Sequence, residues 1–498
     1  MEAAEVIAGA PPRILASDRE VTRLGSSVFR EGRISEEAIT FVCGVLARMA
    51  ATYQRLDVVG VRAVATSAVR DASNQEEFVR RASQAAGTPI EIISGLEEAR
   101  LIHLGVQSQW PHLKHRILIV DIGGGSAEII SGDQGTMEAG ISRPLGALRL
   151  SEVFMKSDPP DNGQLQRMML FIDEKLDAAV RKIGVRPFDR AIGTSATAAA
   201  IVSAINRIPR VRRDDVSRLR ATTPQVRKFF KTVAALNLME RRKINGIGPR
   251  RAEIIIPGAA VLLRVLETFQ LPAVYYSSAG VRDGIIADLA ARGVGRERIH
   301  LAREQTLYLE STARRFGVSL KHARKVAALA HALFDGFQPL HQLAPENGKL
   351  LEAAAYLLDV GHFISATGHH KHSAYIVQNS DLPGFNDHER MLISMLCRFH
   401  RKGMPAPRHQ SFQALSAEDK HVLLYLIPLL RLADSLDSDQ EQKVESLQLQ
   451  TNGNTTTVGL VTRGANIDLN VWAAELAATT FRSVYNHSVE FAMSRRSA

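Results

Sequence analysis

The segment from Ile117 to Ile130 constrains the fold more than any other part of the sequence. The apolar run ILIV leads to Asp121 and Ile122, three glycines and a serine follow, and apolar character resumes in AEII. A short apolar run bounded by glycines is typical of a strand buried on both faces. We therefore predict a strand over 116–122, a turn over the glycines and a second strand after them.

Strand-like and helix-like patterns alternate around this hairpin up to about Gly284. Residues 58–65 and 89–94 have the composition of strands, and 76–87 and 96–106 have helical spacing, which indicates an α/β fold. Past Arg292, Ala and Leu recur at helical spacing until about Ser446, and this predicts an all-helical domain. The remainder contains the hairpin-like pair Asn452-Gly453 and ends in a helical pattern, which predicts a small α+β domain.

Charge is distributed unevenly along the chain. The formal net charge of +10 over 498 residues favours polyanionic partners. Between Arg207 and Arg251 there are 14 Lys or Arg residues and 3 Asp or Glu residues. The only aromatic residues there are Phe229 and Phe230, so the segment has no interleaved stacking platform and nucleic acid is an unlikely partner. A solvated helix face is the alternative interpretation of such a run.

No targeting or membrane segment is predicted. The N-terminus, MEAAEVIAGAPPR, has an acidic residue where a signal peptide would have positive charge. The longest apolar runs, such as Val422 to Leu430, are far shorter than the ~20 residues that span a bilayer. Cys43 and Cys397 lie far apart and form no CxxC pair, which favours a reducing cytoplasm and argues against a disulfide framework.

The glycine turn has the composition of an anion site. Gly123, Gly124 and Gly125 lack Cβ atoms, so their backbone N–H groups can curl around a phosphate, and Ser126 adds a hydroxyl donor. The flanking Asp121 and Glu128 are suited to Mg²⁺, which prefers oxygen ligands and often bridges carboxylate to phosphate. The alternative is a flexible hairpin turn with incidental acids. No Walker A sequence is present.

Three other loops at strand ends carry suitable groups. In SGLEEAR, at 94–100, acids occupy a first helical turn, where they also complement the helix dipole. A carboxylate there could orient or deprotonate the water that attacks a phosphoanhydride. TSAVR, at 66–70, and GTS, at 193–195, offer hydroxyl groups to phosphate oxygens.

Together these segments resemble the Ppx/GppA phosphatase family, which comprises exopolyphosphatases and guanosine pentaphosphate phosphohydrolases with an actin-like fold. The matching stretches cover nearly the whole chain: TRLG (22–25), VRAVATSAVRDASN (61–74), IEIISGLEEARLIHLGV (90–106), ILIVDIGGGSAEII (117–130), GTSAT (193–197), RRAEIIIPGAAVL (250–262), SSAGVRDG (277–284), residues 350–386, FHRKG (399–403) and LLRLAD (429–434). The resemblance implies actin-like domains at 1–116 and 117–291, a helical HD-like domain at 292–445 and a small C-terminal domain at 446–498.

The resemblance also implies a role for each site residue. Glu98 would be the catalytic carboxylate that acts on water, and Asp121 and Glu128 would hold Mg²⁺. The phosphate-binding residues would be Arg70, Gly123, Gly124, Gly125, Ser126, Gly193, Thr194 and Ser195.

The implied substrate is inorganic polyphosphate, cleaved at its terminal phosphoanhydride. Guanosine pentaphosphate presents the same bond and is the alternative. A non-catalytic relative that binds polyphosphate or a nucleotide is a third possibility, because the chain lacks the first phosphate-binding loop that opens the family's sequences. Its first residues resemble the strand after that loop, so we expect the first sheet to lack a strand. Ala196 also replaces a glycine that is usual in GTSAT.

The helical domain resembles HD-type metal phosphohydrolases. Residues 300–421 hold 12 of the 16 histidines. The residues that could stand in a metal array are His322, Asp359, His369, His370, His400 and Asp434. The His-Asp pair of those enzymes is broken, because Leu358 precedes Asp359. We therefore predict that GHHKHSAY (368–375) and FHRKG form a polar, partly cationic surface for polyphosphate or for a homodimer contact.

Overall fold

The computed structural model describes residues 1–7, 12–22, 24–109, 115–213, 219–292, 301, 303–462 and 466–494. Arg23 of the TRLG segment, His300 and part of the N-terminal segment lie outside these ranges. The chain divides into two compact units, residues 1–295 and 296–498, which are described separately.

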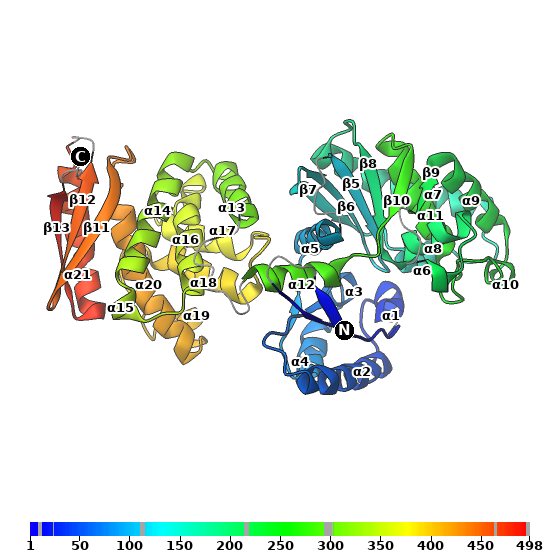
Figure 1. The fold of residues 1–498 in the computed structure, drawn as a ribbon, viewed down its shortest axis with the longest axis horizontal. Coiled ribbons are helices and arrows are strands. Elements are labelled where there is room, and N and C mark those ends of the chain that lie inside the picture. Colours follow the sequence, from blue (N-terminus) through cyan, green and yellow to red (C-terminus); the bar gives the residue numbers. More distant parts are fainter. Residues whose placement is uncertain are drawn as a thin grey trace. The chain divides into compact units, whose positions relative to one another are not determined.

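A six-stranded sheet organises most of the first unit (Figure 1). Its order is β7-β6-β5-β8-β10-β9. Strands β5, β6 and β7 pair antiparallel, β5, β8 and β10 pair in parallel, and β9 is antiparallel to β10. The strands are β5 (Ile117–Ile122), β6 (Ala127–Asp133), β7 (Thr136–Arg143), β8 (Arg190–Thr194), β9 (Arg220–Thr222) and β10 (Ala273–Tyr276).

Strand β5 has both faces buried, which confirms the prediction. Leu118, Val120 and Ile122 pack into the core formed with α6, α7, α8, α9 and α11. Ile117 and Ile119 point the other way, into a smaller core with α5, because successive side chains alternate along a strand. The helices are α5 (Gly95–Gln109), α6 (Ala147–Phe154), α7 (Asn162–Ile183), α8 (Ser195–Ile205), η1 (Arg210–Arg212), α9 (Thr223–Ala235), α10 (Leu238–Arg241), α11 (Ile255–Thr268) and α12 (Val281–Arg292).

Helices α5 and α12 pack with their backbones unusually close. A Cβ atom on Gly284 would lie 1.8 Å from the carbonyl oxygen of Leu101, and one on Gly105 would lie 2.3 Å from that of Gly280. Both positions therefore require glycine. This contact fixes the position of α5, which carries the acids of SGLEEAR.

The N-terminal part of this unit has two separate pairs of strands. Strand β1 pairs antiparallel with β2, and β3 pairs in parallel with β4. Among the described residues the two pairs form separate sheets, and the loss of a strand from the first sheet stays a prediction. The elements are β1 (Glu2–Glu5), β2 (Arg13–Ser17), α1 (Leu24–Glu31), α2 (Glu36–Arg55), β3 (Ala63–Ala65), α3 (Ser67–Arg70), α4 (Gln75–Ala86) and β4 (Ile90–Ile92).

The predicted buried strand over 58–65 is wrong in length and burial. Only Ala63–Ala65 forms a strand, and Val59 is 86% exposed. The reason is that β4 offers only three partners, so the residues before Ala63 have no ladder to join.

The second unit is helical with a small sheet, as predicted. Strands β11 and β12 form a hairpin whose turn is Gly453 and Asn454, one residue later than predicted. The C-terminal helix is followed by β13, parallel to β12, which the sequence interpretation missed. The elements are α13 (Arg303–Arg315), α14 (Leu320–Gly336), α15 (Gln338–His341), α16 (Glu346–Leu357), η2 (Val360–Phe363), α17 (His369–Gln378), α18 (Asp387–Phe399), α19 (Gln410–Gln413), α20 (Ala417–Ser435), β11 (Val444–Asn452), β12 (Thr455–Thr462), α21 (Asp468–Tyr485) and β13 (Ser488–Ser494).

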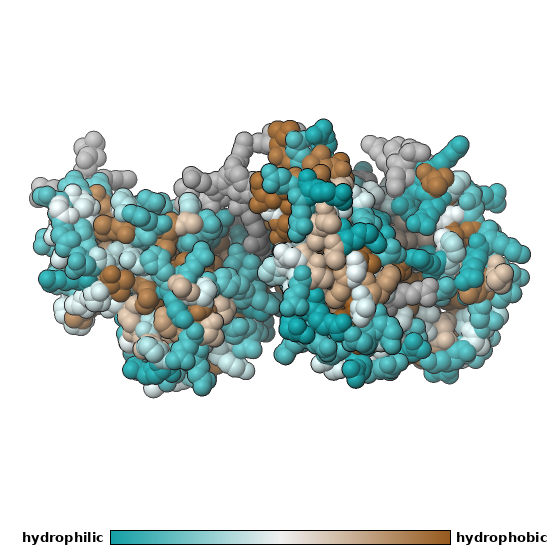
Figure 2. All heavy atoms as spheres, turned by 90° about the horizontal axis from the view of Figure 1, so that it is seen from below, coloured by the Kyte–Doolittle hydropathy of each residue, from teal (hydrophilic) through white to brown (hydrophobic). Residues whose placement is uncertain are grey.

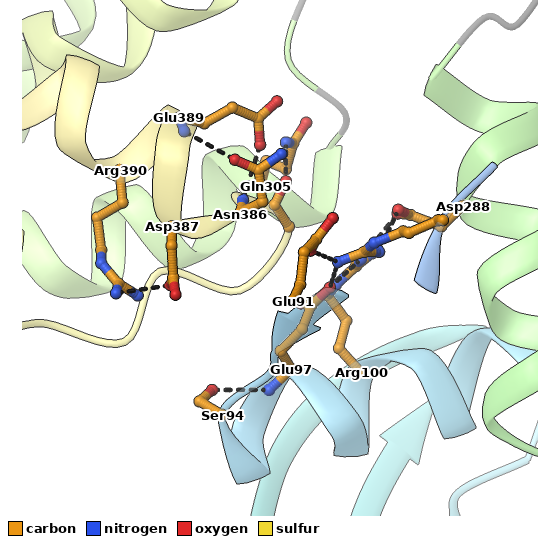
Figure 3. A network of polar contacts seen from close by, with 12 residues as sticks. Glu91, Ser94, Glu97, Arg100, Asp288, Gln305, Asn386, Asp387, Glu389 and Arg390 are labelled. Carbon is orange, nitrogen blue, oxygen red and sulfur yellow. Dashed lines mark hydrogen bonds and ion pairs between the residues drawn. The ribbon is translucent and has the colours of Figure 1, made fainter. Parts of the chain in front are cut away.

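Side-chain caps define several helix starts in this unit. At α18, Asn386 and Glu389 form a reciprocal capping box, and Asp387 pairs with Arg390 in the same turn (Figure 3). The face shown in Figure 2 is mainly hydrophilic, with hydrophobic residues in smaller patches. Within the described ranges, no helix combines the length and apolar character needed to cross a bilayer.

Candidate active site

Four neighbouring strands of the large sheet place polar side chains in one row. Asp121 of β5 lies opposite Glu128 of β6, Glu128 lies opposite Ser142 of β7, and Asp121 is also in register with Thr194 of β8. Side chains at directly paired positions share a face of the sheet. Ser142, Glu128, Asp121 and Thr194 therefore form a continuous row on the face that packs against α5.

Hydrogen bonds orient both carboxylates of the row. The Ser142 hydroxyl donates to Oε1 of Glu128 at 2.6 Å, and the Thr194 hydroxyl donates to Oδ2 of Asp121. Ser126 also bonds to the Glu128 carboxylate. Sequence reasoning missed Ser142, because nothing but the strand register connects it to Glu128.

Helix α5 places Glu98 beside this row. A Cβ atom on Gly95 would lie 2.3 Å from the Cβ of Ser142, so only glycine lets the first turn of α5 approach the sheet this closely. Glu98 follows three residues later and is buried. Its Oε2 atom has no hydrogen-bond partner within the described part of the chain, and the nearest cation is Arg70, with Nη2 at 3.6 Å.

The neighbouring acid, Glu97, serves a different purpose. It accepts two hydrogen bonds from Arg100, at 2.7 and 2.8 Å, and Arg100 also reaches Asp288 of α12 (Figure 3). Its backbone N–H donates to Ser94, which caps α5 (Figure 3). Arg62 completes the network with Glu97 and Asp288. Glu97 thus ties α5 to α12, whereas Glu98 faces the two carboxylates of the sheet.

The electrostatics of the two acids differ accordingly. Burial raises the pKa of the Glu98 carboxyl to about 7; the Arg70 guanidinium opposes this rise and the Asp121 carboxylate adds to it. Burial opposes ionisation of Glu97 too, but its pKa is lowered because the Arg100 and Arg62 guanidiniums lie beside it. Glu97 thus has cations at hydrogen-bond distance, whereas the Arg70 guanidinium beside Glu98 lies 3.6 Å away.

The sheet carboxylates are also short of positive charge. Burial, and then the charges of Glu98 and Asp121, raise the pKa of Glu128 well above its usual value. Burial likewise raises the pKa of Asp121, although the Thr194 hydrogen bond and the Arg251 charge oppose it. Three neighbouring carboxylates whose pKa values are all raised form a set that a divalent cation would neutralise. The unpartnered Oε2 of Glu98 fits the same interpretation.

The glycine turn joins the large sheet to the N-terminal part of the unit. The Gly123 N–H donates to the Ser126 carbonyl and closes the turn, while the Gly124 carbonyl accepts from two N–H groups at the start of α6. A Cβ atom on Gly125 would lie 2.6 Å from both the Phe29 ring and the Ser67 hydroxyl. In the described chain, no protein acceptor binds the N–H groups of Gly124 and Gly125, which leaves them available to an anion.

Three arginines lie around the turn and the row. Arg70 donates to the Ile93 carbonyl and approaches Glu98. Arg149 donates to the Gly125 carbonyl at 2.7 Å and pairs with Asp71. Arg251 donates to Thr197 at 3.1 Å and its charge acts on Asp121. Of these, sequence reasoning named only Arg70; Arg251 stands in the segment RRAEIIIPGAAVL, but its basic neighbours gave no reason to prefer it.

The GTS loop, at 193–195, supports the row from the β8 side. A Cβ atom on Gly193 would lie 3.0 Å from both Ala198 and Val274, so the strand and helix meet closely there. Ser195 adopts a left-handed φ of 71°, and its hydroxyl donates to the Ile122 carbonyl at 3.0 Å. A hydroxyl has one proton, and those of Thr194 and Ser195 are engaged within the protein in this structure.

The histidine-rich segments form only part of the predicted polar surface. His369, His370 and His400 are each 2–3% exposed, because α17 and the end of α18 pack together inside the helical unit. Lys371 and Tyr375 of GHHKHSAY are exposed, and so are Arg401 and Lys402 of FHRKG. Both segments therefore agree with the prediction in part.

Comparisons with known proteins relate this chain to one phosphatase family. The Ppx/GppA phosphatase family matches residues 3–292, and domain III of the same family matches residues 302–477. A guanosine-5'-triphosphate,3'-diphosphate pyrophosphatase from Photobacterium profundum is 27% identical over 415 residues, covering 83% of this chain and 80% of the relative.

Two solved structures each resemble more than half of the chain. The Ppx/GppA enzyme of Aquifex aeolicus has a TM-score of 0.51 at 28% identity, and 57% of this chain covers 94% of it. An exopolyphosphatase from Cytophaga hutchinsonii ATCC 33406 has a TM-score of 0.54 at 26% identity, and 59% of this chain covers 95% of it.

Proposed function

Because the chain belongs to the Ppx/GppA phosphatase family, we propose that it is an exopolyphosphatase that releases the terminal phosphate of inorganic polyphosphate with Mg²⁺. The family assignment makes it a phosphatase that hydrolyses phosphoanhydride bonds. The identity of the substrate, polyphosphate, and of the metal, Mg²⁺, is what we propose beyond the family assignment. We also infer actin-like domains at 1–116 and 117–291, an HD-like helical domain at 292–445 and a small domain at 446–498.

A path of positive charge leading away from the carboxylate row supports a long anion as the substrate. Arg251 donates to the Thr197 hydroxyl, and its charge acts on Asp121. Burial lowers the pKa of the Arg251 guanidinium, and the nearby charge of Arg210 lowers it further. Arg210 is exposed and lies in the basic segment, so the charge continues from the buried row to the surface. A polymer can use such a path, whereas a single terminal phosphate occupies only its buried end.

Each residue of the row has a role in the proposed reaction. Asp121 and Glu128 would hold Mg²⁺, which neutralises charge on the phosphoryl oxygens when bound. The N–H groups of Gly124 and Gly125 and the Arg70 guanidinium would hold the terminal phosphoryl group. Glu98, with its pKa raised to about 7 by burial, is suited to accept the proton of the attacking water. Thr194 and Ser142 would hold the carboxylates in place.

Guanosine pentaphosphate is the second candidate, because the relative from Photobacterium profundum is named for that type of reaction. Phosphate release from long-chain polyphosphate and from guanosine pentaphosphate, measured side by side with and without Mg²⁺, tests the proposal. We expect a higher kcat/KM for polyphosphate. A higher value for the nucleotide would replace the first substrate with the second, and no release from either would identify a non-catalytic relative.

The charge path can be tested separately. Arg210→Gln should raise KM for long polyphosphate and leave KM for short chains nearly unchanged. Arg80→Gln, an equal change of charge on the exposed side of α4, is the matched control and should alter neither. Equal effects of Arg210→Gln on long and short chains would remove the support that this path gives.

A further inference from the structure

A second cluster of metal-ligating side chains lies inside the helical unit, within residues 296–498. Asp359 follows α16, His362 lies in η2, and His369 begins α17. One ligand atom from each of these three side chains lies within 4.8 Å of the other two. His322 of α14, His400 after α18 and Asp434 of α20 surround them.

The spacings within the cluster match those of ligands around one metal ion. Oxygens of Asp359 lie 3.5 Å from Nε2 of His362 and 3.7 Å from Nε2 of His369. Nε2 of His322 lies 3.7 Å from Asp359 and 3.6 Å from Asp434, and the Nε2 atoms of His369 and His400 are 3.2 Å apart. Ligands at about 2.0–2.1 Å from a tetrahedral metal are separated by roughly 3.4 Å.

The tautomers of His369 and His400 leave two lone pairs facing each other. Nδ1 of His369 lies 3.2 Å from the Ala366 carbonyl, and Nδ1 of His400 lies 2.8 Å from the Cys397 carbonyl. A carbonyl only accepts, so each neutral ring carries its proton on Nδ1 and presents a bare Nε2. Two bare nitrogens 3.2 Å apart need a cation between them, either a proton or a metal ion.

A carboxylate orients the His322 ring in the way that the carbonyl groups orient His369 and His400. Nδ1 of His322 lies 2.8 Å from Asp437, a fully buried residue that also accepts the Gln442 N–H at 2.7 Å. Its Nε2 is thereby directed to Asp359 and Asp434. A carboxylate behind the distal nitrogen is the usual outer support of a metal-bound histidine.

His362 supplies the imidazole ligand that is missing at position 358. The sequence predicts a broken His-Asp pair because position 358 is leucine, which offers no ligand. In the structure Leu358 is 1% exposed and lies in the apolar core. The segment after it forms the 3-10 turn η2, with Asp359 at its N-cap. Side chains at i and i+3 eclipse in a 3-10 helix, so His362 comes to lie over Asp359.

We propose that Asp359, His362 and His369 bind one divalent transition-metal ion in the helical unit, with His322, His400 and Asp434 beside them as further candidate donors. Imidazole nitrogens combined with carboxylates favour Zn²⁺, Fe²⁺, Co²⁺ or Mn²⁺ over Mg²⁺, which prefers oxygen alone. The His362 side chain is 45% exposed, so this side of the site is open to solvent. An open side leaves room for water or a ligand on the metal. The proposal does not depend on the substrate of the carboxylate row.

Cobalt binding to the untagged full-length chain tests this proposal. The chain is stripped with EDTA, and Co²⁺ is titrated while visible absorption and X-ray absorption are recorded. We expect one Co²⁺ per chain with imidazole nitrogen among its ligands. Carrying Asp121→Asn in every sample suppresses binding at the carboxylate row, which has no histidine. Absence of nitrogen-ligated Co²⁺ would overturn the proposal.

Variants locate the ion. Asp359→Asn and His369→Gln should each weaken Co²⁺ binding by at least about 100-fold, and Asp437→Asn, which acts through His322, by about 10–100-fold. His372→Gln, on the same helix but only half-buried and outside the cluster, is the matched control and should bind as the parent does. Circular dichroism of the metal-free variants identifies any that fail to fold. If folded Asp359→Asn and His369→Gln bind Co²⁺ like the control, the cluster is not the site.

Discussion

Replacing Glu98 with glutamine should stabilise the metal-free first unit and abolish its activity. Burial raises the pKa of this carboxyl from 4.5 to about 7. Between these two pH values the folded chain binds a proton that the unfolded chain has lost, so stability falls as pH rises through this window. The shift of roughly 2.5 units corresponds to about 3 kcal/mol at 1.36 kcal/mol per unit, and the whole penalty is present above pH 7.

The expected result is a gain of up to about 3 kcal/mol at pH 8 in EDTA for Glu98→Gln, shrinking as the pH approaches 4.5. Hydrogen exchange of peptides covering α5 and β5 measures the stability of this unit without requiring the whole chain to unfold in one step. In the presence of Mg²⁺, phosphate release from polyphosphate should fall by about 10²–10⁴-fold, the usual contribution of a general base.

Glu97→Gln is the matched control, because it makes the same chemical change one residue away. Arg62 and Arg100, with side chains 5% and 4% exposed, would lose part of their compensating charge. Removing one partner of a buried ion pair costs about 3–5 kcal/mol, so this variant should be less stable at pH 8. The two neighbouring substitutions should therefore change the stability of the metal-free unit at pH 8 in opposite directions. If Glu98→Gln destabilised the metal-free unit as much as Glu97→Gln does, Glu98 would be a structural acid and its proposed role would be lost.

Three further predictions concern the metal and the turn. Asp121→Asn should raise the Mg²⁺ concentration that gives half-maximal phosphate release, and an unchanged metal titration would count against Asp121 as a ligand. Ser142→Ala removes the hydroxyl that orients Glu128, and should weaken Mg²⁺ activation by about 10–100-fold in the same titration. Gly125→Ala should destabilise the chain by about 1–3 kcal/mol in thermal unfolding, because its Cβ atom meets Phe29 and Ser67 at 2.6 Å. Gly124→Ala should be nearly neutral, since its nearest neighbour is 3.8 Å away, and equal losses for the two would contradict the packing argument.

Local sequence patterns were sufficient for two strands of the large sheet but not for the row of side chains across it. The apolar run and the flanking glycines predict β5 with its burial, one residue longer at its start than observed, and the strand character of β6. Nothing in one sequence states that position 142 pairs with 128, or 194 with 121. Those pairings depend on strand order and register, which are set by the packing of the whole unit. Ser142 and Arg251 are therefore visible only in the folded chain.

The same reasoning explains the short strand at 63–65. Residues 58–65 have the β-branched composition of a strand, but a strand needs a partner of matching length. Strand β4 pairs with only three of these residues. Composition indicates which residues can adopt a strand conformation, and the length of the partner strand limits how many of them form one.

The two acids of SGLEEAR show where sequence reasoning stops in the active site. Both are buried in the first turns of α5, and both complement the helix dipole equally well. Their separation by about 100° around the helix axis sends Glu97 toward the arginines near α12 and Glu98 toward the sheet. The groups that surround each acid are set in part by residues far away in the sequence. Asp288, for example, pairs with the same Arg100 that binds Glu97. The resemblance predicts Glu98 as the catalytic acid, and this difference in surroundings supports that prediction.

The helical unit gives the reverse case, in which a position-by-position comparison hides a site. Such a comparison requires a histidine at position 358, whereas a metal ion requires a nitrogen at a point in space. The 3-10 geometry of η2 carries the His362 imidazole to the Asp359 carboxylate from four positions downstream of Leu358. The carbonyl groups of Ala366 and Cys397 then fix the tautomers that expose the other two nitrogens. Because these constraints come from backbone conformation, they hold independently of whether the His-Asp pair is intact.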